Sequence, residues 1–325
     1  MMGTRRDPRS ALRLDGPYPL TRADITPLNT LFSDAFTERY RRDGLTGVRV
    51  PPLNPAIWRY AIEAAGAGAM LWRDARGAMA AFNVAHHSGS EGWMGPLAVR
   101  EDCQGAGHGR TIVEAGIAHL KAAGCSVIGL ETMPRTMDNI GFYAGLGFLP
   151  THLTVTLTID AARTTLAPRL LTALPPAGRA AALQACAALT AEVQPGYDYT
   201  REIALTQELA LGDTILLDDG DTLVGFALCH AAPLVEGRAR DELRVLKLVL
   251  RDAGLMELMV SQLGDLAARS GAARAAIRMQ GTYPDAFRTL VARGARVRWT
   301  DLRMVLAGFA EPAPQMGMAL SNWEI

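Results

Sequence analysis

The apolar residues of the first half of the chain change their spacing several times. Over residues 21–37 they recur at intervals of three and four, which predicts an amphipathic helix, and a shorter helix is expected over 57–64. Two short apolar runs, 69–73 and 78–85, then flank a turn, which is typical of a β-hairpin. After it we expect a strand over 93–99, a helix ending before Gly124, a strand over 127–131, a short helix over 139–144 and a strand over 148–159.

The second half repeats this order of elements. A hairpin is expected over 214–230, followed by a strand over 243–250, a helix over 255–268, a strand over 273–279, a helix over 285–292 and a strand ending near 306. The same order twice predicts a tandem duplication. We therefore expect an α/β (α+β) fold of two domains, each a mixed, mostly antiparallel sheet flanked by helices. The expected division is a flexible leader over 1–18, a first domain over 19–160, a linker over 161–178, a second domain over 179–310 and a tail over 311–325.

Charge and cysteine content narrow the range of functions. Lysine plus arginine and aspartate plus glutamate each number 33, so the chain lacks the basic excess typical of nucleic-acid binders. The 4 cysteines are scattered, which predicts reduced thiols and neither a disulfide framework nor a zinc site. The start of the chain lacks the apolar core of a signal peptide, and no run approaches the roughly 20 apolar residues of a membrane span. We expect a cytoplasmic protein without a metal, a nucleic-acid partner or a membrane partner, as a monomer or homodimer.

A glycine-rich turn follows the strand over 93–99 and opens the next helix. It reads Gln104-Gly105-Ala106-Gly107-His108-Gly109, with Arg110 after it. Glycines let backbone N–H groups approach an anion, and a helix N-terminus adds unpaired donors and partial positive charge. A pyrophosphate suits such a site. The turn lacks the Gly-Lys-Ser/Thr ending of a P-loop, and the preceding hairpin is unlike the start of a Rossmann unit.

Two segments resemble the signature motifs of the GNAT superfamily of acyl-CoA N-acyltransferases. The turn at 104–109 is similar to the superfamily's Gln/Arg-x-x-Gly-x-Gly/Ala motif. Residues 139–148 are similar to its second motif, in which a tyrosine, here Tyr143, stands four residues before the pair Gly147-Phe148. The resemblance covers residues 19–159, whereas the second half is similar in element order alone. It implies acetyl-CoA as the co-substrate.

The resemblance also implies roles for individual residues. The strand at 96–99 would pair with the pantetheine arm like an added strand, and an N–H near Ala98 or Val99 would stabilise the oxyanion. Tyr143 would protonate the departing sulfur. Thr136 stands where many members have asparagine, with Asn139 one helical turn later, so the pantetheine contact stays open between the two. The implied cofactor-binding set is Leu97, Ala98, Val99, Gln104, Gly105, Ala106, Gly107, His108, Gly109, Arg110, Asn139 and Tyr143.

Several residues are candidates for the base that accepts the proton of the attacking amine. Glu131 ends the strand over 127–131, which the resemblance places beside the strand at 96–99, and is the first candidate, although a solvated strand end explains it equally well. The pair His86-His87 ends a hairpin strand and also suits an ordinary surface. Glu91 and Asp138 are lesser candidates.

The second copy lacks the glycine loop. Its residues 250–255 contain a single glycine, and Asp252 would repel a pyrophosphate. Leu290 stands at the position of Tyr143. We expect this copy to complete the acceptor pocket or to stabilise the first domain. Tyr197, Tyr199, Tyr283 and Trp299 are candidates to line that pocket, or ordinary core residues.

These observations predict an N-acetyltransferase. It would transfer an acetyl (acyl) group from acetyl-CoA to a small-molecule or peptide amine by direct attack in a ternary complex. The alternative is a non-catalytic acyl-CoA-binding sensor or scaffold, which would keep the glycine loop without needing Tyr143. The acceptor and the acyl chain length stay open.

Overall fold

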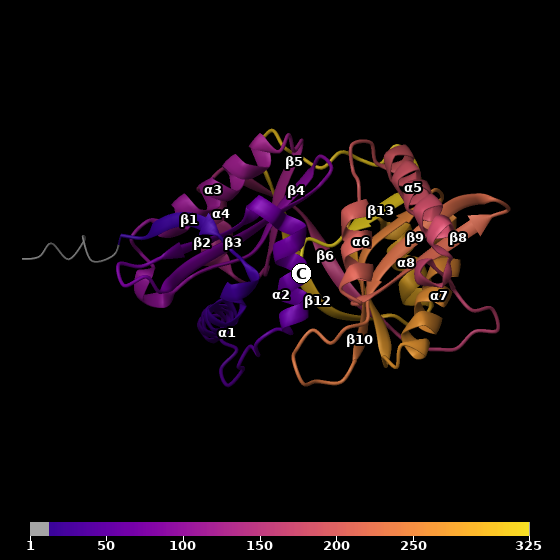
Figure 1. The fold of residues 1–325 in the computed structure, drawn as a ribbon, viewed down its shortest axis with the longest axis horizontal. Helices are drawn as coiled ribbons and strands as arrows, with labels where there is room; N and C mark the ends of the chain where they lie inside the picture. The colour runs from indigo at the N-terminus through magenta and orange to yellow at the C-terminus, as the bar shows by residue number, and fades with distance from the viewer. Residues whose placement is uncertain (1–12, 325) are drawn as a thin grey trace, which may run out of the picture.

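The computed structural model describes residues 13–324 and places the two halves of the chain side by side (Figure 1). The first half comprises β1 (Asp15–Pro19), α1 (Ile25–Arg42), α2 (Pro55–Ala65), β2 (Ala69–Arg73), β3 (Met79–Ser88), β4 (Glu91–Val99), α3 (His108–Ala122), β5 (Val127–Thr132), α4 (Met137–Ala144) and β6 (Phe148–Asp160). The second half comprises β7 (Arg169–Leu170), α5 (Pro176–Val193), α6 (Thr200–Glu208), β8 (Gly212–Asp219), β9 (Thr222–His230), β10 (Glu242–Leu250), α7 (Met256–Arg269), β11 (Arg274–Gln280), α8 (Pro284–Ala292), β12 (Arg296–Leu306) and β13 (Met318–Ser321).

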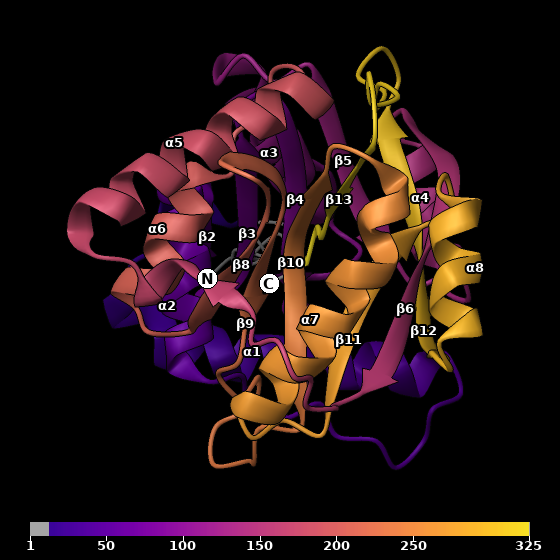
Figure 2. The ribbon, with the colours of Figure 1, turned by 90° about the vertical axis from the view of Figure 1, so that its right-hand side faces the viewer.

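Helices cover both faces of the strands in each half. In β2, Leu71 packs into the core under α1 and α2, whereas Met70 packs into the core under α3 and α4. In β8, Leu216 faces α5 and α6 and Ile215 faces α7 and α8. Figure 2 shows these two helix pairs on opposite sides of the second half's strands. Because both faces are covered, strands such as β2 and β9 consist of nearly continuous apolar runs.

The strands form one continuous 13-stranded sheet that crosses the boundary between the halves. Strand β12 lies between β5 and β6, and β6 lies between β12 and β11. Each half therefore supplies a central strand to the other. Among the strands of residues 13–324, only β4–β5 and β10–β11 pair in parallel, at equivalent places in the two halves. Because of this exchange, the strands of neither half form a complete sheet without a strand from the other half.

Each parallel pair is hydrogen-bonded only at its beginning. Strand β4 pairs with β5 over Glu91–Met94, and its later residues leave that edge open. A register shift against β3 lies at this point, and Pro96 has no N–H to donate, so the local geometry turns β4 away from β5. Strand β10 pairs with β11 only over Glu242–Arg244. Both halves thus contain a V-shaped opening between two parallel strands.

The C-terminal segment lies at the centre of the molecule, between the halves (Figure 1). Strand β13 pairs antiparallel with the later residues of β10, Lys247 to Leu250. The hydroxyl of Tyr283 donates to the carbonyl of Ala319 at 3.1 Å, and Lys247 Nζ donates to Ser321 Oγ at 2.7 Å. The V-shaped opening of the second half is therefore filled by the chain itself.

The fold class expected from the sequence is confirmed: the helices flank a mixed, mostly antiparallel sheet in a tandem arrangement. The two expected sheets are joined into one. Strand β1 begins within the segment expected to be a leader, whose residues 1–12 lie outside the described part. The segments expected as linker and tail contain β7 and β13, respectively.

Candidate functional site

A cleft of about 670 Å³ opens beside β4 in the first half. It is bordered by α1, β4, the glycine loop, the start of α3, β5 and α4, and on its remaining side by residues of β12 and the C-terminal segment. Most residues selected from the sequence line it, namely Leu97, Ala98, Val99, Gln104, Gly105, Gly107, Gly109, Arg110, Glu131, Asn139 and Tyr143. Ala106 and His108 are not among its lining residues.

The glycine loop has the backbone geometry of an anion cradle. Gly105 and Gly107 have φ of +81° and +86°, a region that disfavours other residues, and a Cβ on either would meet no atom within 4 Å. Gly107 is the N-cap of the 15-residue helix α3, and no side chain caps this terminus. The N–H of Arg110 donates to the carbonyl of Gly107 at 3.1 Å, whereas the start of α3 before it, at Gly109, lies on the cleft, where a helix N-terminus favours an anion.

The outer edge of β4 provides the second part of the cleft. Residues Leu97 to Val99 pair with β3 on one side, and the other side faces the cleft. The side chain of Gln104 donates to the carbonyl of Val99 at 2.8 Å, which ties the glycine loop to the strand. This edge can pair with an extended ligand as an added strand would.

Tyr143 lies on α4 at the border between the core and the cleft. Its ring packs against Phe142 and Phe148, with centroids 5.2 and 6.0 Å away, and only 8% of the residue is exposed. Burial raises the pKa of Tyr143 to about 12. Within residues 13–324 no group hydrogen-bonds to its hydroxyl. The phenol therefore stays protonated near neutral pH and can donate to a ligand.

Glu131 is held in a rigid ion pair. Its carboxylate accepts hydrogen bonds from Thr154 at 2.5 Å, from Arg303 Nε at 3.0 Å and from Arg278. These partners lower the pKa of Glu131 to about 2, against the opposing effect of its burial. Such a carboxylate accepts a proton poorly, so its role as the base stays a prediction that this geometry disfavours.

Of the other residues selected from the sequence, some line the cleft and others are buried away from it. Asn139 lines the cleft, whereas the buried Thr136 donates to Asp43 at 2.8 Å, so the geometry favours Asn139 for the pantetheine contact. Asp138 also lines the cleft. Glu91 is buried beside the C-terminal segment and accepts a hydrogen bond from Trp323 Nε1 at 2.7 Å.

The cleft residues that come from α1, β12 and the C-terminal segment include Tyr40, Trp299, Asp301 and Glu324. Of these, sequence analysis selected only Trp299. The tyrosines proposed with it are elsewhere: Tyr197 and Tyr199 lie in the core, and Tyr283 holds β13. Since no local pattern links β12 or the C-terminal segment to the cleft, their contribution was not detectable from the sequence.

Charged side chains from both halves meet at this wall of the cleft. Arg278 forms ion pairs with Glu131, with Asp301 at 3.0 Å and with Glu324 at 2.9 Å. Burial raises the pKa of Asp301, and desolvation by the cleft wall raises the pKa of Glu324 to about 7 even though half of its side chain is exposed, while Arg278 acts in the opposite direction on both. Because Asp301 and Glu131 add their negative charge to this desolvation, Glu324 holds a proton more readily than an ordinary glutamate.

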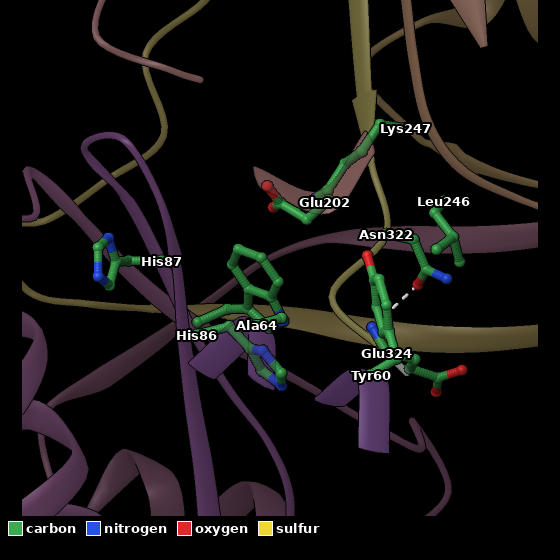
Figure 3. Close-up of a pocket in the computed structure, with 10 residues that line it drawn as sticks. Tyr60, Ala64, His86, His87, Glu202, Leu246, Lys247, Asn322 and Glu324 are labelled. Atoms are coloured by element: carbon green, nitrogen blue, oxygen red, sulfur yellow. Dashed lines mark hydrogen bonds between the residues drawn. The ribbon is translucent and has the colours of Figure 1, made fainter. Parts of the chain in front are cut away.

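A small internal cavity of about 20 Å³ adjoins this wall (Figure 3). Glu324 lines both the cavity and the cleft, and its backbone N–H donates to the side chain of Asn322 at 2.9 Å, drawn as a dashed line. His86 and His87 lie on the cavity side and not in the cleft. Burial lowers the pKa of His86 to about 3, so it is neutral near pH 7. The cavity has room for about one water molecule.

The second half has the same framework without an open site. Strand β13 fills its V-shaped opening, and a Cβ on Gly317 would lie 2.0 Å from the carbonyl oxygen of Leu250. In the loop that replaces the glycine loop, the side chain of Asp252 accepts from the N–H of Gly254 at 2.7 Å. Leu290, the seventh residue of α8 as Tyr143 is of α4, is fully buried.

The sequence of the first half, which contains the cleft, matches a known protein family. Residues 33–148 match the model of the Acetyltransferase (GNAT) family, and the whole chain has a tandem arrangement similar to that of solved GNAT folds. No curated protein sequence matches the chain.

Solved structures show the same fold over nearly the whole chain. A GCN5-related N-acetyltransferase from Sphaerobacter thermophilus has 13% identity and a TM-score of 0.59, covering 98% of this chain and 99% of its own. The N-myristoyltransferase of Saccharomyces cerevisiae with bound myristoyl-CoA has 10% identity and a TM-score of 0.62, covering 96% and 89%. A tandem GNAT protein from the clavulanic acid biosynthesis pathway has 11% identity and a TM-score of 0.56, covering 92% and 98%. At such identities the likeness establishes the fold.

Residues 13–324 contain neither a candidate membrane span nor a candidate metal cluster. None of their helices combines the length and apolar character needed to cross a bilayer. No group of three or more His, Cys, Asp and Glu side chains among them is arranged to hold a metal ion.

Proposed function

We propose that the protein is an acyl-CoA-dependent N-acyltransferase that transfers an acetyl group from acetyl-CoA to a primary amine within a ternary complex. The observation that carries this proposal is a cleft lined by the open edge of β4, by the glycine loop and by Tyr143.

The residues of the cleft fit the parts of acetyl-CoA. The N–H groups of Gly105, Gly107 and Gly109 would hold the pyrophosphate at the uncapped N-terminus of α3, beside Arg110. The β4 edge would pair with the pantetheine arm, with Asn139 contacting the arm from α4. This arrangement directs the thioester toward the inner end of the cleft.

The chain supplies two groups for the chemistry. An N–H at Ala98 or Val99 would stabilise the negative charge that develops on the carbonyl oxygen. The hydroxyl of Tyr143 would donate its proton to the departing sulfur, since its raised pKa keeps the phenol protonated. A sensor that only bound acyl-CoA would need neither group.

Calorimetric titration with acetyl-CoA tests the site. Wild type should bind one molecule per chain, because β13 fills the second opening. Gly107→Glu should weaken binding by at least about 100-fold, since a carboxylate would stand where the pyrophosphate binds. Gly124→Glu is the matched control: Gly124 also has positive φ, +79°, and open surroundings, but it ends α3 at the far side from the cleft.

Each outcome has a distinct meaning. Absence of binding to wild type, or equal loss in both variants, would refute the cofactor site. Binding without CoA release in the presence of primary amines would favour the sensor over the enzyme. Titration with octanoyl-CoA beside acetyl-CoA tests the acyl preference.

A further inference from the structure

The C-terminal segment occupies two places that bear on the proposed reaction. Strand β13 fills the opening of the second half, and three residues later Glu324 reaches the wall of the first half's cleft. Trp323 anchors the turn between these places: it is 1% exposed, and its ring lies 3.7 Å from the Arg303 guanidinium carbon. The position of Glu324 is thus determined by a buried neighbour.

Glu324 combines contact with protein and access to the cleft. Its carboxylate pairs with Arg278 at 2.9 Å, yet 50% of its side-chain surface is exposed. Glu131, by contrast, has 1% of its side chain exposed, and all its near partners are donors. Unlike Glu131, the Glu324 carboxylate can therefore both contact a ligand in the cleft and take up a proton.

The surroundings of Glu324 contain more acids than bases. Arg303 shares its guanidinium between Glu131 and Glu311, and Arg278 is shared by Glu131, Asp301 and Glu324. Two guanidinium groups therefore serve four carboxylates. A site with such a surplus attracts a cation or retains a proton. The charged and titratable groups facing Glu324 are Arg278 on β11, Asp301 on β12, Glu131 on β5, Arg244 on β10 and Tyr40 on α1, with His86, Glu202 and Lys247 across the small cavity.

The wall also has an aromatic component. The rings of Tyr40 and Trp299 lie 6.3 Å apart, and both line the cleft next to Asp301. Trp299 Nε1 donates to Asp301 at 3.1 Å, which orients the indole and the carboxylate together. Aromatic faces beside carboxylates suit an organic cation.

We propose that Glu324 accepts the proton of the acceptor amine, and that Asp301 and Trp299 select for a primary amine that arrives as an ammonium ion. This inference rests on the proposed function. It makes the second half a contributor of the acceptor site, while the first half supplies the acetyl-CoA site.

The acceptor amine gives up two protons during the proposed reaction, one before and one after it attacks the thioester. The ammonium gives one proton to the Glu324 carboxylate, and the neutral amine attacks the thioester carbonyl to form the C–N bond. When the C–S bond breaks, Tyr143 donates its hydroxyl proton to the sulfur, and the proton remaining in excess on nitrogen returns to the Tyr143 oxygen. Glu324 then releases its proton to solvent, so one proton leaves per turnover.

The test compares Glu324→Gln with wild type by CoA release and by acetyl-CoA titration. The variant should bind acetyl-CoA within about two-fold of wild type and lose about 100-fold in kcat/KM. In wild type, kcat/KM should rise with pH and level off above about 7, because only the deprotonated Glu324 accepts a proton. This limb should be absent from the variant.

Glu311→Gln provides a matched control. Burial raises the pKa of Glu311 to about 7 as well, but Glu311 does not line the cleft. This variant should retain the pH limb. Normal activity and an intact limb in Glu324→Gln would overturn the inference, and loss of the limb in Glu311→Gln alone would do the same. Failure of wild type to bind acetyl-CoA would instead refute the proposed function on which the inference rests.

A second experiment tests which amines the protein accepts. Tyramine, tryptamine and 1,4-diaminobutane should be acetylated in preference to glycine and aspartate, whose amines stand beside carboxylates. Asp301→Asn should reduce that preference by raising KM for the cationic amines. Equal or better use of the two amino acids would overturn the assigned acceptor class.

Discussion

Removal of the Trp323 side chain should destabilise the whole protein, although the residue lies near the end of the chain. The indole is 1% exposed, and its ring fills space that Gly129 leaves open: a Cβ there would lie 2.2 Å from the ring. Its Nε1 donates to the buried Glu91 at 2.7 Å. Trp323→Ala therefore leaves a cavity between the halves and a buried acceptor with one partner fewer.

The magnitude follows from these contacts. Truncating a buried tryptophan costs about 3–5 kcal/mol, and a buried acceptor that loses a partner adds to this. We take a loss of about 4 kcal/mol. An unfolding entropy of about 2.1 cal/mol/K per residue gives roughly 0.7 kcal/mol/K for the chain. The melting temperature should thus fall by about 6 °C.

Thermal unfolding followed by circular dichroism measures this change. One transition is expected, because the exchanged strands β6 and β12 bind the halves into one sheet. Trp323→Phe keeps an aromatic ring and removes only the N–H, so it should cost about 1–2 kcal/mol. A fall of less than about 2 °C for Trp323→Ala would refute the reasoning, since the segment would then contribute little to the core.

Two further predictions concern residues selected from the sequence. Tyr143→Phe should lower kcat about 100-fold while leaving acetyl-CoA affinity within about two-fold, measured by CoA release and calorimetry; an unchanged kcat would remove Tyr143 from the chemistry. Glu131→Gln should cost about 3–5 kcal/mol at pH 7, because Arg278 and Arg303 lose a buried partner. Because the pKa of Glu131 is lowered from 4.5 to about 2, the stability it supplies is present above pH 4.5 and is lost as the pH falls toward 2. The difference between variant and wild type in urea unfolding should therefore be smaller at pH 3 than at pH 7, and a constant difference would contradict this account.

Much of the cofactor side of the site was accessible from the sequence. The loop at 104–109 and the helix carrying Tyr143 are continuous segments, and their glycines and apolar spacing are local signals of backbone geometry. The lining of the cleft contains nearly all the residues selected on that basis. The acceptor side was not accessible in the same way, because Asp301 and Glu324 follow no pattern and reach the cleft only through long-range pairing.

For Glu131, the sequence predicted the position of the side chain but not its protonation state. Its place at the end of a strand beside the cleft followed from sequence spacing. Its protonation behaviour depends on Arg278 and Arg303, which are 147 and 172 positions away along the chain. Only the folded chain brings these guanidinium groups to the carboxylate and lowers its pKa.

The sequence by itself determined the local elements, their tandem order and the glycine loop, because apolar periodicity and turn residues act over a few positions. The tertiary structure decided which strands pair across the halves, what fills the second opening and which acids face the cleft. These depend on hydrogen-bonded edges and charges that meet only after folding. Strand β13 shows this most directly: it is four residues long, and only the unpaired edge of β10 makes it a strand.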